Sequence, residues 1–364
     1  MSFLGLKKID IYIIKKFLGT YFLAIILIIF IAIIFDLSEK IDDFIENGAP
    51  VSAIIFDYFL NFAPYLANLF SYLFTFIAVI FFTSKMAYNT EIIAILSNAV
   101  SYQRMLVPYL VSATIISSIS FTLAAWVIPR ANAERFEFEE QYYYDHQFRF
   151  SEKNVHKQIE PGLFVYIESY SNSQELARRF SLERIEDGKL ISKLTSNYAV
   201  WDSTINKWSI FDYSIREFDG EKEILTQGNQ IDTTLNLHPE YFAQRENVIE
   251  AMTLKELNYY IDDLIMQGAN GVIIAQIEKA KRFAGPFSTF ILTVLGVSVS
   301  SRKVRGGIGG HLGIGVAASF SYIFFQQFAA QFSIGGYISP TLAVWIPNIL
   351  YGIITYMFYR KAPK

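Results

Sequence analysis

The sequence predicts a multi-pass α-helical membrane protein: six transmembrane helices with an inserted all-β, jelly-roll-like domain. Charge segregation is the first reason, because five windows that contain no Asp, Glu, Lys or Arg hold 144 of the 364 residues. These windows are 17–35, 58–84, 105–129, 283–301 and 306–359. Each has at least 19 residues, enough for a helix to cross a hydrocarbon layer of about 30 Å. A soluble protein needs charge over its whole surface, so this distribution indicates a membrane protein.

The last window is too long for one helix. Its 54 residues contain Gly335, Gly336 and Pro340, which are turn formers and divide it into two. The six predicted spans are therefore roughly 17–35, 58–83, 106–128, 284–301, 307–332 and 341–359. The first is too long for a typical signal-peptide core, and no small-residue cleavage site follows it, so we expect an uncleaved first span.

Basic residues in the short loops predict the orientation. The loops on one side, with both termini, contain twelve Lys and Arg residues but only two acids, Asp10 and Glu91. The opposite short loops contain Lys40 and six acidic residues: Asp36, Glu39, Asp42, Asp43, Glu46 and Asp57. Since short cytoplasmic loops are enriched in Lys and Arg, we expect both termini in the cytoplasm.

The long segment 130–282 then lies outside the cytoplasm. Residues 130–150 are predicted to continue the third span as a polar helix. Alternating runs broken by turns predict strands at 163–170, 179–185, 190–201, 207–217 and 223–227, within a β domain at about 155–240. A helix is expected at 253–267, where Thr253 and Glu256 have capping-box spacing. The predicted organisation is three spans in 1–129, this external segment, and three spans in 283–364.

Several classes of function are excluded by what the sequence lacks. Without cysteine it has no disulfide, thiolate metal site or cysteine nucleophile, and its four histidines are scattered. Without a G-x-x-x-x-G-K-[ST] motif it is not expected to bind nucleotide phosphates. We therefore predict no catalytic residues, metal or cofactor, and no enzyme activity. A net charge of −3 with no basic cluster also argues against nucleic-acid binding.

His311 is the one ionisable side chain within the predicted spans. It lies at the cytoplasmic end of the fifth span, where we favour a packing or interfacial role over a proton relay. An ion-coupled transporter is therefore not expected. If the protein moves a substrate, the energy comes from another protein.

The cytoplasmic segment 85–104 carries the clearest candidate site. A short helix is expected at about 88–99, with Asn89 or Thr90 as its cap and Glu91 at its positive N-terminal end. Ile92, Ile95 and Leu96 form an apolar stripe along it. Two interpretations remain open. The helix lies on the membrane surface, or it docks into a groove on a cytoplasmic partner with Glu91 as its one charged anchor.

Glycines are concentrated where the fifth span begins. Gly306 and Gly310, and likewise Gly309 and Gly313, are four residues apart, which favours close helix–helix packing. Alternatively, this smooth surface lets the helix slide or part from a neighbour, as at a lateral gate.

Three stretches resemble the LptF/LptG (YjgP/YjgQ) permease family of the lipopolysaccharide-export ABC transporter. Residues 83–101 resemble its coupling helix, with Glu91 and Ser101 matching and Ala99 where the family usually has Gly. Residues 198–202 with 207–212, then 237–240 and 252–257, resemble its periplasmic jelly roll and the exit from it, and 335–348 resemble its last hairpin. The stretches occur in the family's order, and the resemblance covers essentially the whole chain.

The resemblance implies partners and a mechanism. It implies a permease subunit in the inner membrane of a Gram-negative bacterium, paired with a homologous or identical second permease on a cytoplasmic ABC ATPase dimer. Thr90, Glu91, Ile92, Ile95 and Leu96 would couple to the ATPase, and the fifth-span glycines would lie at a lateral gate. Lipopolysaccharide from the membrane would pass to periplasmic jelly-roll bridge proteins.

Lys40 is a candidate contact for the lipid, or it pairs with a neighbouring acid. Two other functions stay open at this point. One is a permease for another lipid or lipoprotein, and the other is a non-transporting receptor or scaffold with a periplasmic sensing domain.

Overall fold

The computed structural model describes residues 7–143, 154–171, 174–219, 222–235, 237, 248–267, 271–302 and 308–362. The chain divides into two units, and each is described by itself. The helical unit contains Met1–Phe138, Glu250–Leu254 and Ile273–Lys364. The β unit contains Glu139–Ile249 and Lys255–Val272.

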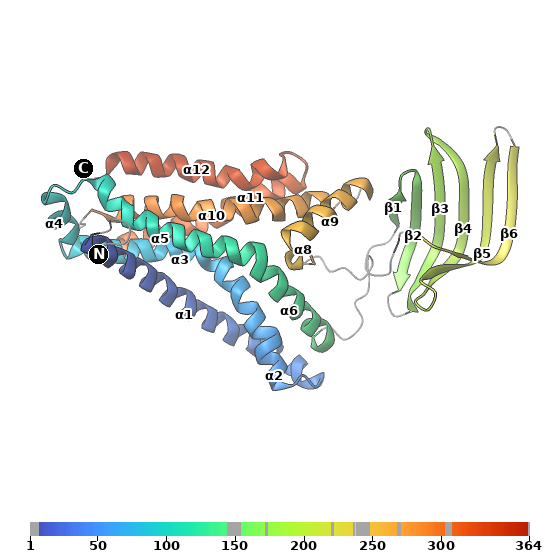
Figure 1. The fold of residues 1–364 in the computed structure, drawn as a ribbon, viewed down its shortest axis with the longest axis horizontal. Helices are drawn as coiled ribbons and strands as arrows, with labels where there is room; N and C mark the ends of the chain where they lie inside the picture. Colours follow the sequence, from blue (N-terminus) through green and yellow to red (C-terminus); the bar gives the residue numbers. More distant parts are fainter. Residues whose placement is uncertain are drawn as a thin grey trace. The chain divides into compact units, whose positions relative to one another are not determined.

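Six helical segments in the described part of the chain are long and apolar enough to cross a membrane, which confirms the predicted spans. They contain α1 (Lys8–Glu46), α2 with α3 (Val51–Ala53 and Leu60–Tyr88), α5 with α6 (Tyr102–Thr122 and Ile128–Tyr142), α10 (Val272–Ser300), α11 (Ile308–Ile334) and α12 (Pro340–Lys361) (Figure 1). Single π-helical turns at Ile54–Phe59 and Leu123–Val127 join the two composite segments. The predicted break in the last window is confirmed, because α11 ends at Ile334 and α12 begins at Pro340.

The first four spanning segments extend well beyond the charge-free windows. The 39 residues of α1 correspond to about 58 Å of helix at about 1.5 Å per residue, roughly twice the hydrocarbon thickness. The predicted polar continuation of the third span is confirmed as α6, which is described to Tyr142. Charged residues at the helix ends therefore lie outside the apolar middle.

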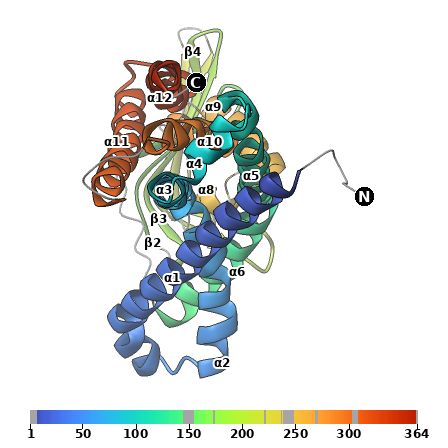
Figure 2. The same cartoon turned by 90° about the vertical axis from the view of Figure 1, so that its left-hand side faces the viewer.

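Helix α3 lies between α1 and α11 at the centre of the helical unit (Figure 2). Its Ala78, Val79 and Phe82 join a buried apolar cluster with α1 and α5. Its Phe76 and Ile80 join a second cluster with α10, α11 and α12. The most apolar windows of α1 and α11 are only 17% and 22% buried, so these two spans have the most surface left to face lipid or another protein.

The β unit contains one six-stranded antiparallel sheet in the order β1-β2-β3-β4-β5-β6. The strands are β1 (Val155–Glu160), β2 (Leu163–Ser171), β3 (Leu176–Glu186), β4 (Lys189–Asp202), β5 (Lys207–Asp219) and β6 (Lys222–Thr233). This confirms the inserted β domain. Strand β1 was missed, because its polar sequence VHKQIE lacks the apolar alternation typical of a strand.

Local sequence and packing explain the sheet. Asp187 and Gly188 both have positive φ, as the tight turn of the β3–β4 hairpin requires. Opposite each other on β4 and β5, Trp201 and Trp208 join Phe180 in an apolar core on the sheet. The indole of Trp208 is fully buried and donates to the Leu237 carbonyl at 2.6 Å. The predicted helix at 253–267 is confirmed as α9 (Leu254–Gln267), which follows the short α8 (Val248–Ala251).

Candidate functional site

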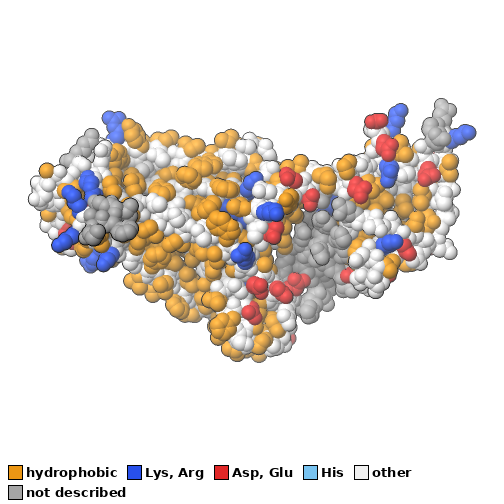
Figure 3. All heavy atoms as spheres, in the orientation of Figure 1, with side chains coloured by type: hydrophobic (Ala, Val, Ile, Leu, Met, Phe, Trp, Pro, Cys, Tyr) orange, Lys and Arg blue, Asp and Glu red, His pale blue; other side chains and the backbone are white. Residues whose placement is uncertain are grey.

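The two ends of the helical unit carry opposite charge. Figure 3 shows Lys and Arg side chains gathered at the end with α4 and both termini, and Asp and Glu side chains near α2. We call the first the basic end, which includes Lys7, Lys8, Lys15, Lys16, Lys85, Arg104, Arg360 and Lys361. We call the second the acidic end, which includes Asp36, Glu39, Asp42, Asp43, Glu46 and Asp57.

Helix α4 (Glu91–Ser97) is the predicted short helix at the basic end, and it is shorter than expected. Thr90 precedes it with a left-handed backbone, φ 64°, which is strained for a β-branched residue. The expected side-chain cap is wrong, because the Thr90 hydroxyl donates to the Asn89 carbonyl at 2.6 Å instead of accepting from the helix. Strain of this kind is typical of functional segments.

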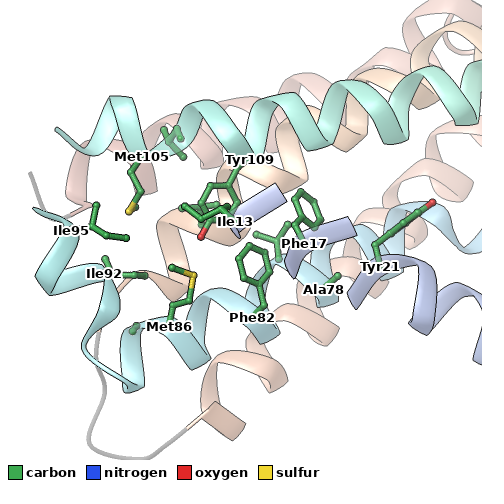
Figure 4. Close-up of a cluster of buried hydrophobic side chains, with 14 of the residues drawn as sticks. Ile13, Phe17, Tyr21, Ala78, Phe82, Met86, Ile92, Ile95, Met105 and Tyr109 are labelled. Atoms are coloured by element: carbon green, nitrogen blue, oxygen red, sulfur yellow. The ribbon is translucent and has the colours of Figure 1, made fainter. Parts of the chain in front are cut away.

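The apolar stripe of α4 faces the protein's own interior. Ile92 and Ile95 are buried and point toward Met86 and Met105, in the cluster that also contains Ile13 of α1 (Figure 4). Leu96 is partly buried against the same cluster. Burial of one such aliphatic side chain contributes about 1.5–3 kcal/mol, so α4 is firmly seated on α1, α3 and α5.

The opposite face of α4 is open. Ile93 is 52% exposed and Tyr88, just before the helix, is 57% exposed. Ala94, Ser97 and Asn98 are exposed beside them. This small, nearly uncharged face is available for contact with another protein, whereas the predicted stripe holds the helix in place.

Glu91 links α4 to α1. Its carboxylate accepts from the Tyr12 hydroxyl at 3.1 Å and from the Asn89 amide at 3.2 Å. Within the described residues, no Lys, Arg or His lies within 4.0 Å of it. The carboxylate is half-buried and lies next to the open face of α4.

Asp10 joins α1 to α5. It is 1% exposed and accepts two hydrogen bonds from the Arg104 guanidinium, at 2.8 and 2.5 Å, and one from the Lys7 backbone at 2.7 Å. A bidentate pair of this kind fixes both position and direction. The only two acids that the sequence places among the short basic loops thus both tie α1 to its neighbours.

Ala99 and Ser101 form the connection from α4 to α5. Ala99 has φ 61°, a left-handed position two residues after the helix end that glycine usually occupies. The Ser101 hydroxyl accepts from the Arg104 backbone at 3.2 Å and caps α5. The connection therefore requires the left-handed backbone that glycine would favour, although this chain has alanine there.

At the acidic end, Lys40 is held by two partners. Its ammonium lies 3.1 Å from the Asp36 carboxylate and also donates to the Tyr58 hydroxyl. Tyr58 is fully buried and donates to Asp36 at 2.8 Å, which closes a triangle between α1 and the π-helical turn. Lys40 was expected either to contact the lipid or to pair with a neighbouring acid, and in the structure it pairs with Asp36. Tyr58 gave no signal in the sequence, since one Tyr among 23 does not stand out.

Of the predicted fifth-span glycines, the three that the structure describes do not pack against another described helix. A Cβ added at Gly309, Gly310 or Gly313 would meet no atom within 4 Å, and Gly306 lies outside the described residues. Close packing occurs instead at Gly315, where an added Cβ would come within 2.6 Å of Ile80 of α3. His311 is buried and its Nδ1 lies 3.0 Å from the Ser84 hydroxyl, so it joins α11 to α3.

Six helical segments able to span a membrane, a short helix seated on their basic end and an inserted antiparallel sheet define, within the described residues, a multi-pass membrane protein with an inserted β domain. Among the described residues, no group of three or more His, Cys, Asp or Glu could hold a metal ion.

The sequence matches one protein-family model over nearly its whole length. A model described as lipopolysaccharide export system permease LptF/LptG matches residues 11–361, and the chain belongs to this family. It is therefore a multi-pass inner-membrane protein of the permease class that serves lipopolysaccharide export. A search of curated proteins found no match.

Proposed function

We propose that this chain is the permease subunit of an ABC transporter that extracts lipopolysaccharide from the inner membrane and passes it to a periplasmic bridge. A separate cytoplasmic ATPase dimer would hydrolyse ATP, since this chain has no P-loop motif. Both termini and α4 would lie in the cytoplasm and the β unit in the periplasm, as the distribution of basic residues indicates.

The observation that carries the proposal is the seating of α4. Its inner face shares one buried cluster with α1, α3 and α5, while Ile93 and Tyr88 remain exposed on the other side. A push by the ATPase on the open face would therefore move α1 directly, without an intervening flexible segment. The Tyr12–Glu91 hydrogen bond adds a polar link between the same two helices.

A second permease would complete the lipid cavity. Spans α1 and α11 are the least buried of the six, and Gly309, Gly310 and Gly313 leave a smooth, unfilled surface on α11. Small residues of this kind let a second helix approach closely in a membrane. We propose that α1 of one subunit faces α11 of the other and that the two part as a lateral gate.

The β unit would receive the lipid and pass it on. Strand β6 is the last in the sheet, and its side chains are mostly exposed, including Ile224 and Leu225. A sheet edge with unpaired backbone groups accepts another strand, so this edge fits a periplasmic bridge protein of similar architecture.

Two substitutions separate the roles of Glu91. Glu91→Lys reverses the charge beside the open face of α4, so we expect loss of ATPase copurification and of lipopolysaccharide transfer to the bridge. Tyr12→Phe removes only the internal hydrogen bond, so ATPase binding is retained while less lipid is transferred per ATP hydrolysed. Glu46→Lys makes the same charge change at the exposed acidic end and serves as the control.

Retention of both ATPase binding and lipid transfer in Glu91→Lys would overturn the proposal. A chain that never copurifies with an ATPase would instead indicate a receptor or scaffold. Photocrosslinking from the exposed face of α1 to a different lipid would indicate another substrate.

A further inference from the structure

A cavity of about 240 Å³ lies inside the helical unit, away from α4 and from the fifth-span glycines. It is bounded by α3, by the segment from α5 to α6, and by α8, α10 and α11. Its polar lining consists of Tyr65, Asn68, Tyr72, Ser120, Glu250, Glu278, Lys281, Arg282, Gln326 and Gln327. Nothing in the proposed transport mechanism uses this cavity.

Two of the charged residues that line the cavity, Arg282 and Glu278, form an ion pair with each other. The Arg282 Nε lies 3.2 Å from the Glu278 carboxylate, and Arg282 Nη1 donates to the Met252 carbonyl at 2.6 Å. Arg282 is 4% exposed, so this pair is a fixed part of the wall.

The other two charged residues have no such partner. Neither the Glu250 carboxylate nor the Lys281 ammonium makes a hydrogen bond or ion pair with any residue that the structure describes. Burial raises the pKa of Glu250 and the nearby Glu278 raises it further, whereas the charges of Arg135, Lys281 and Arg282 oppose the rise without a direct ion pair. An unpaired charge in a partly buried site is costly, which indicates that a group from outside the chain completes it.

The rest of the wall is apolar. Leu69, Ala124, Ile128, Pro286 and Ile323 line it. Leu69 belongs to a charge-free window of a spanning segment and is 49% exposed, so an apolar, open rim borders the cavity on this side. The cavity thus combines a polar interior with an apolar border, as a lipid at the membrane surface requires.

We propose that this cavity binds the head group of a phospholipid that carries a primary ammonium, as ethanolamine phospholipids do. The ammonium would donate to Glu250, and the phosphate would pair with Lys281. A zwitterionic ligand explains why one carboxylate and one ammonium line the same cavity without pairing with each other. The volume suits a head group with its chains outside, because sites for whole drug-sized ligands are about 300–1,000 Å³.

The first test compares three lipids on the unmodified full chain. The protein is placed in nanodiscs of phosphatidylethanolamine, phosphatidylcholine or phosphatidylglycerol, and bound lipid is measured by native mass spectrometry after release. We expect phosphatidylethanolamine to bind at least about tenfold more tightly than the other two, the effect of losing one charge-assisted hydrogen bond. Phosphatidylcholine tests N–H donation, because its ammonium has no proton to donate, and phosphatidylglycerol tests the need for a cation.

The second test uses variants in the same nanodiscs. Glu250→Gln and Lys281→Met should each weaken phosphatidylethanolamine binding about tenfold. Lys279→Met, on the same helix but outside the cavity lining, should leave binding unchanged. Thermal unfolding of each variant shows whether it is folded, and the lipid comparison does not depend on the variants.

Equal affinity for the three lipids, or preference for phosphatidylglycerol, would overturn the proposal. So would variants at Glu250 and Lys281 that bind like Lys279→Met. Added lipopolysaccharide should leave the phospholipid bound, and displacement would show that the cavity serves the transported lipid instead. None of these outcomes depends on ATPase binding, so this proposal and the proposed export function fail separately.

Discussion

At the basic end of the helical unit the buried charge is an acid, Asp10, whereas at the acidic end a base, Lys40, is enclosed together with the acid Asp36, each with 16% of its side chain exposed. Asp10 joins α1 to α5 through Arg104, and Lys40 joins α1 to Tyr58 through Asp36. Most other residues of the majority sign, such as Lys85 at one end and Glu39 at the other, are exposed. These majority charges keep each end in water, and at each end the minority charge, paired with Arg104 or Asp36, holds helices together.

Removing the partner of Asp10 should have the largest effect. Arg104→Met leaves a buried carboxylate with only the Lys7 backbone as donor, so we expect a larger loss in the free energy of unfolding than at any exposed charge. The guanidinium is 34% exposed, so water screens part of the attraction. Chemical unfolding of the full chain in detergent, followed by tryptophan fluorescence, measures it.

Lys85→Met is the matched control, since Lys85 lies at the same end and is exposed. Its effect should stay within about 0.5 kcal/mol. Equal effects of the two substitutions would contradict the distinction between minority and majority charges.

Removing the minority charge at the acidic end should have an intermediate effect. Lys40→Met leaves Asp36 with the Tyr58 hydroxyl as donor, so a loss of about 1–2 kcal/mol is expected in the same unfolding measurement. Glu39→Gln, an exposed neighbour, should change stability by less than about 0.5 kcal/mol. An unchanged stability in Lys40→Met would show that the acidic end is not held by its charges.

The smallest effect on stability is expected at Ala99, which also lies at the basic end but has a strained left-handed backbone instead of a charge. Ala99→Gly should stabilise the protein by up to about 1 kcal/mol, because glycine adopts the left-handed backbone without steric cost. Ala94→Gly, at an exposed position inside α4, should destabilise by about 1 kcal/mol. Melting temperatures of the two variants should therefore shift in opposite directions, and a shift in the same direction would exclude the strain argument.

Elements that depend on local sequence patterns were predicted correctly at both ends of the helical unit and in the sheet. The six spans, the break before Pro340 and five of the six strands follow from local patterns of charge, apolar alternation and turn residues. Strand β1 was missed because its pairing with β2, and not its own pattern, holds it in the sheet. For the candidate site, Glu91 and the short helix were identified, but the inward direction of Ile92 and Ile95 was not.

The sequence alone determined the family, the number of spans and the presence of an inserted β domain. The spans are the clearest case, because crossing a hydrocarbon layer constrains every residue of a window regardless of its neighbours in the fold. Whether an apolar stripe on a short helix faces a partner or its own protein depends on what the fold brings beside it. Met86, Met105 and Ile13 cover that stripe, and Tyr12 reaches Glu91 from 79 residues away. Such long-range packing exists only in the folded chain, and it makes α4 part of the buried core of the helical unit with one face left open.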